Sequence, residues 1–146
     1  MGLDMYLNAK RYLWGDSQAG VVDKISQCFP ELGEHRVKQI TAEVGYWRKA
    51  NHIHKWFVEN VQNGDDDCNS YEVSEDQLKE LLSLIDEVLA DHDKAGALLP
   101  TTSGFFFGNT DYDEFYFESL QYTKEMLTDL LDEKWKTWYF EYQSSW

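Results

Sequence analysis

The densest group of side chains that could do chemistry lies between residues 43 and 57, where Arg48, Asn51 and His54 alternate with aromatic residues. The block falls where a predicted strand passes into a predicted helix. Free N–H groups at a helix start, beside an arginine, can hold an anion. His54 shares its helix face with apolar positions, so two interpretations stay open. In the first, His54 is a general base or a donor to a ligand. In the second, its hydrogen bonds are satisfied within the core, which is the commoner case for a histidine on an apolar face.

A second candidate is the apolar run from Gly104 to Gly108, which contains three consecutive phenylalanines. Such a run is typical of a strand or loop that packs into the core, and it can also form an aromatic platform for a flat ligand. With the first block it defines an alternative pocket for a nucleotide-like small molecule. The residues of this alternative pocket are Arg48, Asn51, His54, Phe106, Tyr112 and Asp113.

A third pattern partly matches a calcium-binding loop. Asp65, Asp67, Asn69 and Asp76 occupy positions 1, 3, 5 and 12 of such a loop, but Ser70 stands at position 6, where the loop needs glycine. Asp76 is also shorter than the glutamate usual at position 12. We therefore expect a solvated turn and no metal site. No pattern names a catalytic residue or implies a cofactor.

The elements that must position these residues follow from hydrophobic periodicity. Ser74 and Gln77 form a capping box before the clearest amphipathic helix. The pattern predicts an α+β fold in one domain, residues 1–146, with an antiparallel sheet of three or four strands packed against three main helices. The predicted strands cover residues 3–14, 37–46 and 137–146; the predicted helices cover a short segment near 21–28, then 50–61, the segment after Ser74 and the segment after Asp111.

Charge is segregated along the chain. The formal net charge is -14, yet residues 1–58 carry +2, whereas residues 59–93 carry -11 and residues 111–133 carry -7. A strongly negative face selects basic partners and repels nucleic acid. The amphipathic pattern places six acids on the solvent faces of the two later helices: Glu80, Glu87, Asp91, Glu118, Glu125 and Asp129.

Composition narrows the class further. Hydrophobic residues make up 42% of the chain and aromatic residues 16%, which is too apolar for a disordered acidic tail. The two cysteines and the lack of a recognisable signal peptide favour free thiols and a cytoplasmic protein. No apolar run approaches the roughly 20 residues of a membrane helix.

Several motifs together resemble a family of small proteins encoded in bacterial and phage genomes. The resemblance covers most of the chain from residue 44 onward. It implies a phage or mobile-element setting and assigns no catalytic role to any residue. The motifs are Tyr46–Asn51, Ile53-His54, Trp56-Phe57, Leu98–Thr101, Gly104–Gly108, Tyr112–Glu114 and Gln143–Trp146.

The leading hypothesis from the sequence is a non-enzymatic binding protein of phage or mobile-element type. Its acidic surface would inhibit a host nucleic-acid-binding or defence protein by imitating a phosphate backbone. The alternative is a small-molecule binding or processing protein that uses the polar-aromatic pocket. A third possibility is that the acidic faces only keep the protein in solution.

Overall fold

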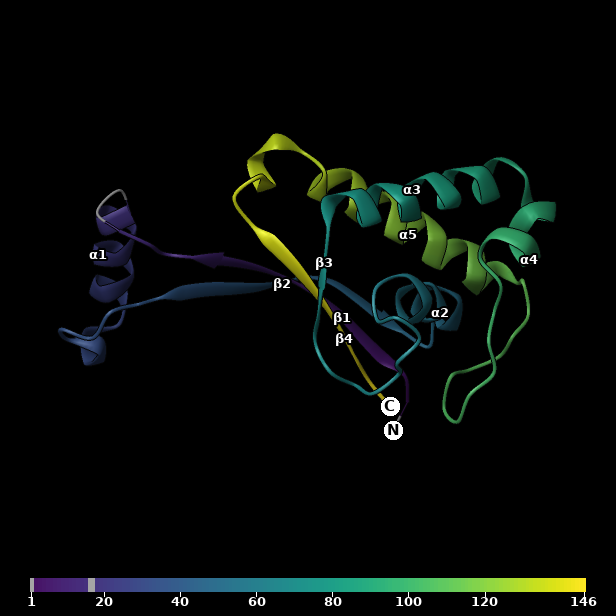
Figure 1. Ribbon diagram of the computed structural model, residues 1–146, viewed down its shortest axis with the longest axis horizontal. Coiled ribbons are helices and arrows are strands. Elements are labelled where there is room, and N and C mark those ends of the chain that lie inside the picture. Colours follow the sequence, from purple (N-terminus) through teal and green to yellow (C-terminus); the bar gives the residue numbers. More distant parts are fainter. Residues whose placement is uncertain (1, 16–17) are drawn as a thin grey trace.

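The computed structural model describes residues 2–15 and 18–146. Its centre is one antiparallel sheet with the strand order β2-β1-β4-β3 (Figure 1). The strands are β1 (Asp4–Tyr12), β2 (Gln39–Arg48), β3 (Tyr71–Val73) and β4 (Tyr139–Ser145). The helices are α1 (Ala19–Cys28), α2 (Asn51–Asn60), α3 (Glu75–Ala90), α4 (Ala95–Leu98) and α5 (Glu114–Leu130), with short 3-10 turns at Pro30–Leu32, His92–Lys94 and Glu133–Trp135.

Helices α2, α3 and α5 lie on one face of the sheet (Figure 1). Alternate residues of β1, namely Met5, Leu7 and Ala9, are fully buried and form the floor of the core. Asp4 and Asn8 point to the opposite, open face. This alternation is expected for a sheet with one covered side, because successive side chains of a strand point to opposite faces. The predicted α+β architecture is confirmed.

Strand β2 departs from its predicted pattern at a bulge. Leu7 pairs with Gly45 and Asn8 pairs with Glu43, so Val44 is an extra residue in the ladder. An extra residue shifts the alternation by one position. Tyr46 is therefore exposed, whereas Trp47 is buried.

Two further elements, β3 and α5, differ from the sequence-based expectation. Strand β3 was not predicted, because three residues are too few to show a period. Helix α5 begins after Asp113, whose side chain accepts a hydrogen bond from the Tyr116 backbone N–H, and not after Asp111. The capping box of Ser74 and Gln77 is present as predicted.

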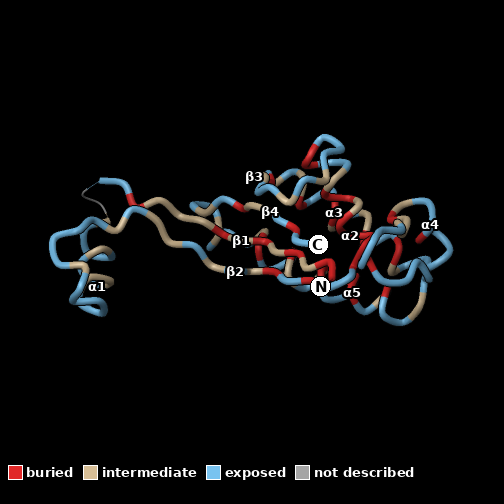
Figure 2. Tube along the Cα trace, turned by 90° about the horizontal axis from the view of Figure 1, so that it is seen from below, coloured by how far each residue is buried: buried red, intermediate tan, exposed pale blue. Residues whose placement is uncertain are grey.

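Residues 13–15 and 18–38 form an arm that projects from the body of the molecule (Figure 1). Strands β1 and β2 continue outward as a two-stranded ribbon, and α1 lies at the far end (Figure 1). Figure 2 shows the arm as exposed or intermediate along nearly its whole length, and α1 has no buried residue. Trp14, Val21 and Phe29 are exposed hydrophobic side chains of this arm.

The cysteines and the helices can be compared with what the composition predicts. Cys28 and Cys68 are both free thiols, as predicted. Among the described residues, the helices are all too short or too polar to span a membrane.

Candidate functional site: a buried polar cluster and an acid-rimmed groove

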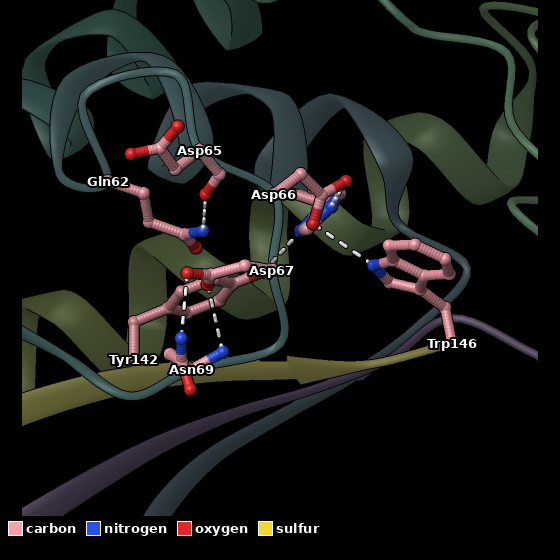
Figure 3. Close-up of polar contacts among 8 residues, drawn as sticks. Gln62, Asp65, Asp66, Asp67, Asn69, Tyr142 and Trp146 are labelled. Carbon is pink, nitrogen blue, oxygen red and sulfur yellow. Dashed lines mark hydrogen bonds and ion pairs between the residues drawn. The ribbon is translucent and has the colours of Figure 1, made fainter.

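His54 lies at the centre of a polar cluster between α2, the loop before β3 and strand β4. Its Nδ1 is 2.7 Å from the Tyr142 hydroxyl, and its Nε2 is 3.0 Å from Asp66 Oδ2. The Trp146 indole N–H donates to the other oxygen of Asp66 at 3.0 Å, and Figure 3 shows the indole pointing at that carboxylate. Both ring nitrogens of His54 are thus occupied by protein groups.

The direction of these hydrogen bonds is set by Tyr142. Burial raises the pKa of Tyr142 well above its ordinary value of 10.0, and the nearby Asp66 charge raises it further. The hydroxyl therefore keeps its proton at neutral pH and donates it to Nδ1. The other nitrogen, Nε2, then carries the ring proton and donates it to Asp66. A histidine held in this way has no free lone pair with which to accept a substrate proton.

His52, two residues earlier on α2, forms a second buried network. Its Nε2 lies 2.7 Å from Ser119 Oγ, and that hydroxyl donates to the Tyr116 carbonyl. The His52 ring also packs on the Tyr116 ring, with centroids 4.2 Å apart. Burial lowers the pKa of His52 to about 3, while the Asp113 charge opposes this shift. His52 is therefore neutral at pH 7 and donates from Nε2.

Asn51 anchors the loop that carries the three phenylalanines. Its amide nitrogen donates to the carbonyls of Phe107 at 3.1 Å and Asn109 at 2.8 Å, and its oxygen accepts from the Thr102 backbone N–H at 3.0 Å. The buried side chain thus uses both donors and its acceptor within the protein. Its geometry is that of a residue that positions a loop.

Only one of the three phenylalanines enters the core. Phe107 is buried and meets His54 edge to face, with ring centroids 5.2 Å apart. Phe105 is 80% exposed and Phe106 is 38% exposed. The expectation that the whole run is buried is wrong, because the chain turns sharply here: Phe106 has a φ of 72°.

The remaining residues of the alternative pocket lie elsewhere. Asp113 caps α5 and accepts from Asn109, and these hydrogen bonds hold its pKa below 3.8. Tyr112 packs on Tyr116 and accepts from the Thr101 N–H at 3.4 Å. Arg48 is exposed at the end of β2 and lines a hollow that faces α5. The structure thus brings His54, Asn51 and the Phe107 loop together but leaves Arg48, Phe106 and Tyr112 outside one common cleft.

The aspartate-rich loop before β3 is organised by its own side chains. Asp67 accepts from the Asn69 backbone and side chain at 3.0 and 2.7 Å (Figure 3). It also accepts from the Tyr71 hydroxyl at 2.8 Å. These hydrogen bonds lower the pKa of Asp67. Within residues 2–15 and 18–146, no group of three or more His, Cys, Asp or Glu side chains is arranged to hold a metal ion.

The six acids predicted to form a negative surface are all exposed. Asp86 of α3 reaches Lys124 of α5 at 2.7 Å, so Asp86 marks the side of α3 that faces α5. Helical geometry places Glu80 and Glu87 about 100° or more around α3 from Asp86. The acids therefore form two flanks, separated by the seam between the helices. The α3 flank contains Glu80, Glu87 and Asp91; the α5 flank contains Glu118, Glu125 and Asp129.

The α5 flank borders a groove against strand β2, which we call the β2–α5 groove. It consists of two hollows of about 290 and 230 Å³ that share Tyr122. The Tyr46 backbone N–H donates to the Tyr122 hydroxyl at 3.1 Å, which joins the strand edge to the helix. Other lining residues are Val44, Tyr46, Arg48, Phe115, Glu118, Glu125, Met126, Asp129 and Trp135. The groove thus has an apolar floor and a mainly acidic rim.

Sequence reasoning missed the partners that occupy the buried histidines. The sequence places Asp66 only in a solvated turn, and Tyr142 in a C-terminal segment that either closes the sheet or lines the pocket. The alternation of Phe140, Tyr142 and Ser144 marks Tyr142 as inward-facing, and this was the available signal. Nothing in the sequence pairs Tyr142 with His54, which is 88 positions away.

A search of protein-family models, of curated proteins and of solved structures finds no match to this chain.

Proposed function

We propose that this chain is a non-enzymatic binding protein whose acidic helices occupy a basic, nucleic-acid-binding surface on another protein. In a phage or mobile element, the class of partner is a host nucleic-acid-binding or defence protein, and the effect is inhibition. The proposal depends on one observation. The polar groups suited to chemistry form hydrogen bonds within the protein, whereas the acids of α3 and α5 face solvent.

The buried groups support a binding role over a catalytic one. His52, His54 and Asn51 direct their polar atoms at protein partners. A general acid or base must reach a substrate directly or through one water molecule. The small-molecule alternative has less support, because Arg48, Phe106 and Tyr112 lie apart from His54 and Asn51.

The exposed acids support electrostatic recognition. The lysines near them are engaged in ion pairs, as Lys124 is with Asp86 and Lys94 is with Glu87, and the acids still greatly outnumber them. A surface with this excess of carboxylates attracts a basic groove at long range and competes with DNA for it.

Competition with DNA tests the proposal. A basic, sequence-nonspecific DNA-binding protein is loaded with a short fluorescent duplex, and release of the duplex is followed by anisotropy as this protein is added. We expect release that weakens as salt is added, because screened charges compete poorly. The protein alone should leave the anisotropy of the free duplex unchanged.

Three variants with the same change in net charge locate the surface. One reverses the α5 flank (Glu118→Lys, Glu125→Lys, Asp129→Lys) and one reverses the α3 flank (Glu80→Lys, Glu87→Lys, Asp91→Lys). The control reverses Asp23, Glu31 and Glu34 in the arm to lysine. Reversal of at least one flank should abolish release of the duplex, whereas the arm control should retain it. Equal loss in all three variants, or no release by the unaltered protein, would refute the proposal.

A further inference from the structure

In the part of the arm that the structure describes, α1 packs on no part of the body (Figure 1). An isolated two-stranded ribbon and a ten-residue helix are each marginally stable in water, because neither buries enough apolar surface. Yet α1 has no buried residue, and Trp14 at the base of the arm is 70% exposed. Large exposed apolar groups gathered on a projecting element mark an interaction site.

The base of the arm, which we call the neck (residues 11–14 and 36–39), has a distinct chemistry. It contains Arg11, Arg36 and Lys38 and no acid. None of the three makes an ion pair with a residue that the structure describes. Tyr12, Leu13 and Trp14 lie beside them and line a hollow of about 450 Å³ with Arg36 and Lys38. The neck is thus basic and aromatic.

The same chain carries the complement of the neck. The β2–α5 groove has a buried apolar floor, formed by Trp47, Ala50 and Leu130. Its rim carries three acids and one base: Glu118, Glu125, Asp129 and Arg48. A basic, aromatic segment matches such a groove in charge and in apolar character. The neck and the groove do not meet within one molecule, because they lie at different places along β2. The neck includes Gln39, and the groove begins at Val44, about 17 Å further along the strand.

Strand β2 is also an edge of the sheet. An edge strand presents backbone groups to which another strand can pair. On β2 the Tyr46 N–H is already bonded to Tyr122, so pairing would use the part of the edge before Tyr46. If two copies lie with their β2 strands antiparallel about a two-fold axis, the first half of each strand faces the second half of the other. Each neck then lies opposite the partner's groove, so the neck-to-groove contact forms twice, as a two-fold interface requires.

We propose that the protein associates with a second copy of itself through the β2 edge, with the neck of each copy seated in the β2–α5 groove of the other. This inference does not rest on the proposed function, because self-association is measured with the purified protein alone.

Sedimentation equilibrium from low to high micromolar concentration tests the association. We expect a mass that rises from the 17.2 kDa of one chain towards twice that value, with weaker association at high salt. A mass that stays at that of one chain over the whole range would overturn the inference.

Two charge-reversal variants test the contact itself. The neck variant is Arg36→Glu with Lys38→Glu, and the groove variant is Glu118→Lys with Glu125→Lys. Each places like charges opposite one another, so each alone should associate at least about tenfold more weakly than the unaltered protein. An equimolar mixture of the two restores opposite charges at both contacts and should form a mixed dimer.

Circular dichroism verifies that both variants are folded, and the affected side chains are exposed. The matched control is Glu80→Lys with Glu87→Lys on the α3 flank, which changes the net charge as the groove variant does and should leave association intact. Self-association that survives both reversals, or a mixture that stays monomeric, would exclude this pairing of neck and groove.

Discussion

The two buried histidines both hydrogen-bond to a hydroxyl group, but in opposite directions. His54 accepts from Tyr142 and donates to a carboxylate, whereas His52 donates to Ser119, whose own proton goes to a backbone carbonyl. Only the His54 cluster includes a negative charge. Protonation of His52 would place a charge in the core without a hydrogen-bonded counterion.

The pKa of His52 predicts a pH-dependent stability. Its folded value of about 3 lies below the ordinary 6.5, so the unfolded chain binds a proton more readily between these values. The contribution of neutral His52 is complete above pH 6.5 and is lost as the pH falls towards 3. We expect the free energy of unfolding to fall by about 1.4 kcal/mol per pH unit in that range from this group.

Urea unfolding at pH 7, 6 and 5 measures this slope. Carboxylates also titrate in acid, so the comparison is with His52→Gln, which should show a shallower fall in stability over the same range. His35→Gln, in the exposed part of the arm, is the control and should keep the original slope. Equal slopes for His52→Gln and the unaltered protein would contradict the assignment.

At the scale of elements, periodicity predicted most of the fold. Strands β1, β2 and β4 and helices α1, α2, α3 and α5 each contain a repeat that one segment displays by itself. The bulge at Val44 was not predictable in this way, because it depends on how β2 pairs with β1. Strand β3 is likewise defined by its partner β4 and by no pattern of its own.

The candidate site was predicted less well, because its contacts join distant segments. Helical spacing placed His54 on the buried face, which is correct. The partners that settle its chemistry come from a loop and from the last strand, and Asn51 is explained only by carbonyls of the loop after α4. Such pairings depend on tertiary structure, which a single sequence does not display.

Gly45 shows how closely β2 and α5 approach. A Cβ atom at this position would lie 2.7 Å from Met126 Sδ and 3.3 Å from Leu7 Cβ. Gly45→Ala should therefore destabilise the protein by about 1 kcal/mol, since Met126 must move and the core is closely packed.

The same substitution in a Met126→Ala background tests the cause. With the sulfur removed, Gly45→Ala should become neutral or slightly stabilising, because alanine restricts the unfolded chain more than glycine does. Gly20→Ala is the control, since nothing lies within 4 Å of a Cβ there. Chemical denaturation gives all the values, and an unchanged cost in the Met126→Ala background would exclude the steric explanation.

At the scale of the whole molecule, self-repulsion opposes folding. The net charge of -14 is concentrated on the body, where ion pairs such as Lys136 with Glu75 offset only part of it. Added salt screens this repulsion. Raising NaCl from 10 to 300 mM should stabilise the protein on the order of 1 kcal/mol, or roughly 3–4 °C in Tm for a domain of this size.

Calorimetry at low protein concentration measures this effect on the monomer. The variant with Glu80→Lys and Glu87→Lys should gain less from salt, because its net charge is smaller. A Tm that falls with salt would mean that attractive ion pairs outweigh the repulsion.

The position of β1 in the sheet has a consequence for biosynthesis. This strand pairs with β2 on one side and with β4 on the other, so Asp4 lies opposite Ser145. On the ribosome, β1 and β2 emerge before β4 and can form their hairpin, but the second side of β1 stays unpaired until β4 leaves the exit tunnel. Until then this side of β1 is an open edge to which a strand of another chain can pair, which exposes the nascent chain to aggregation.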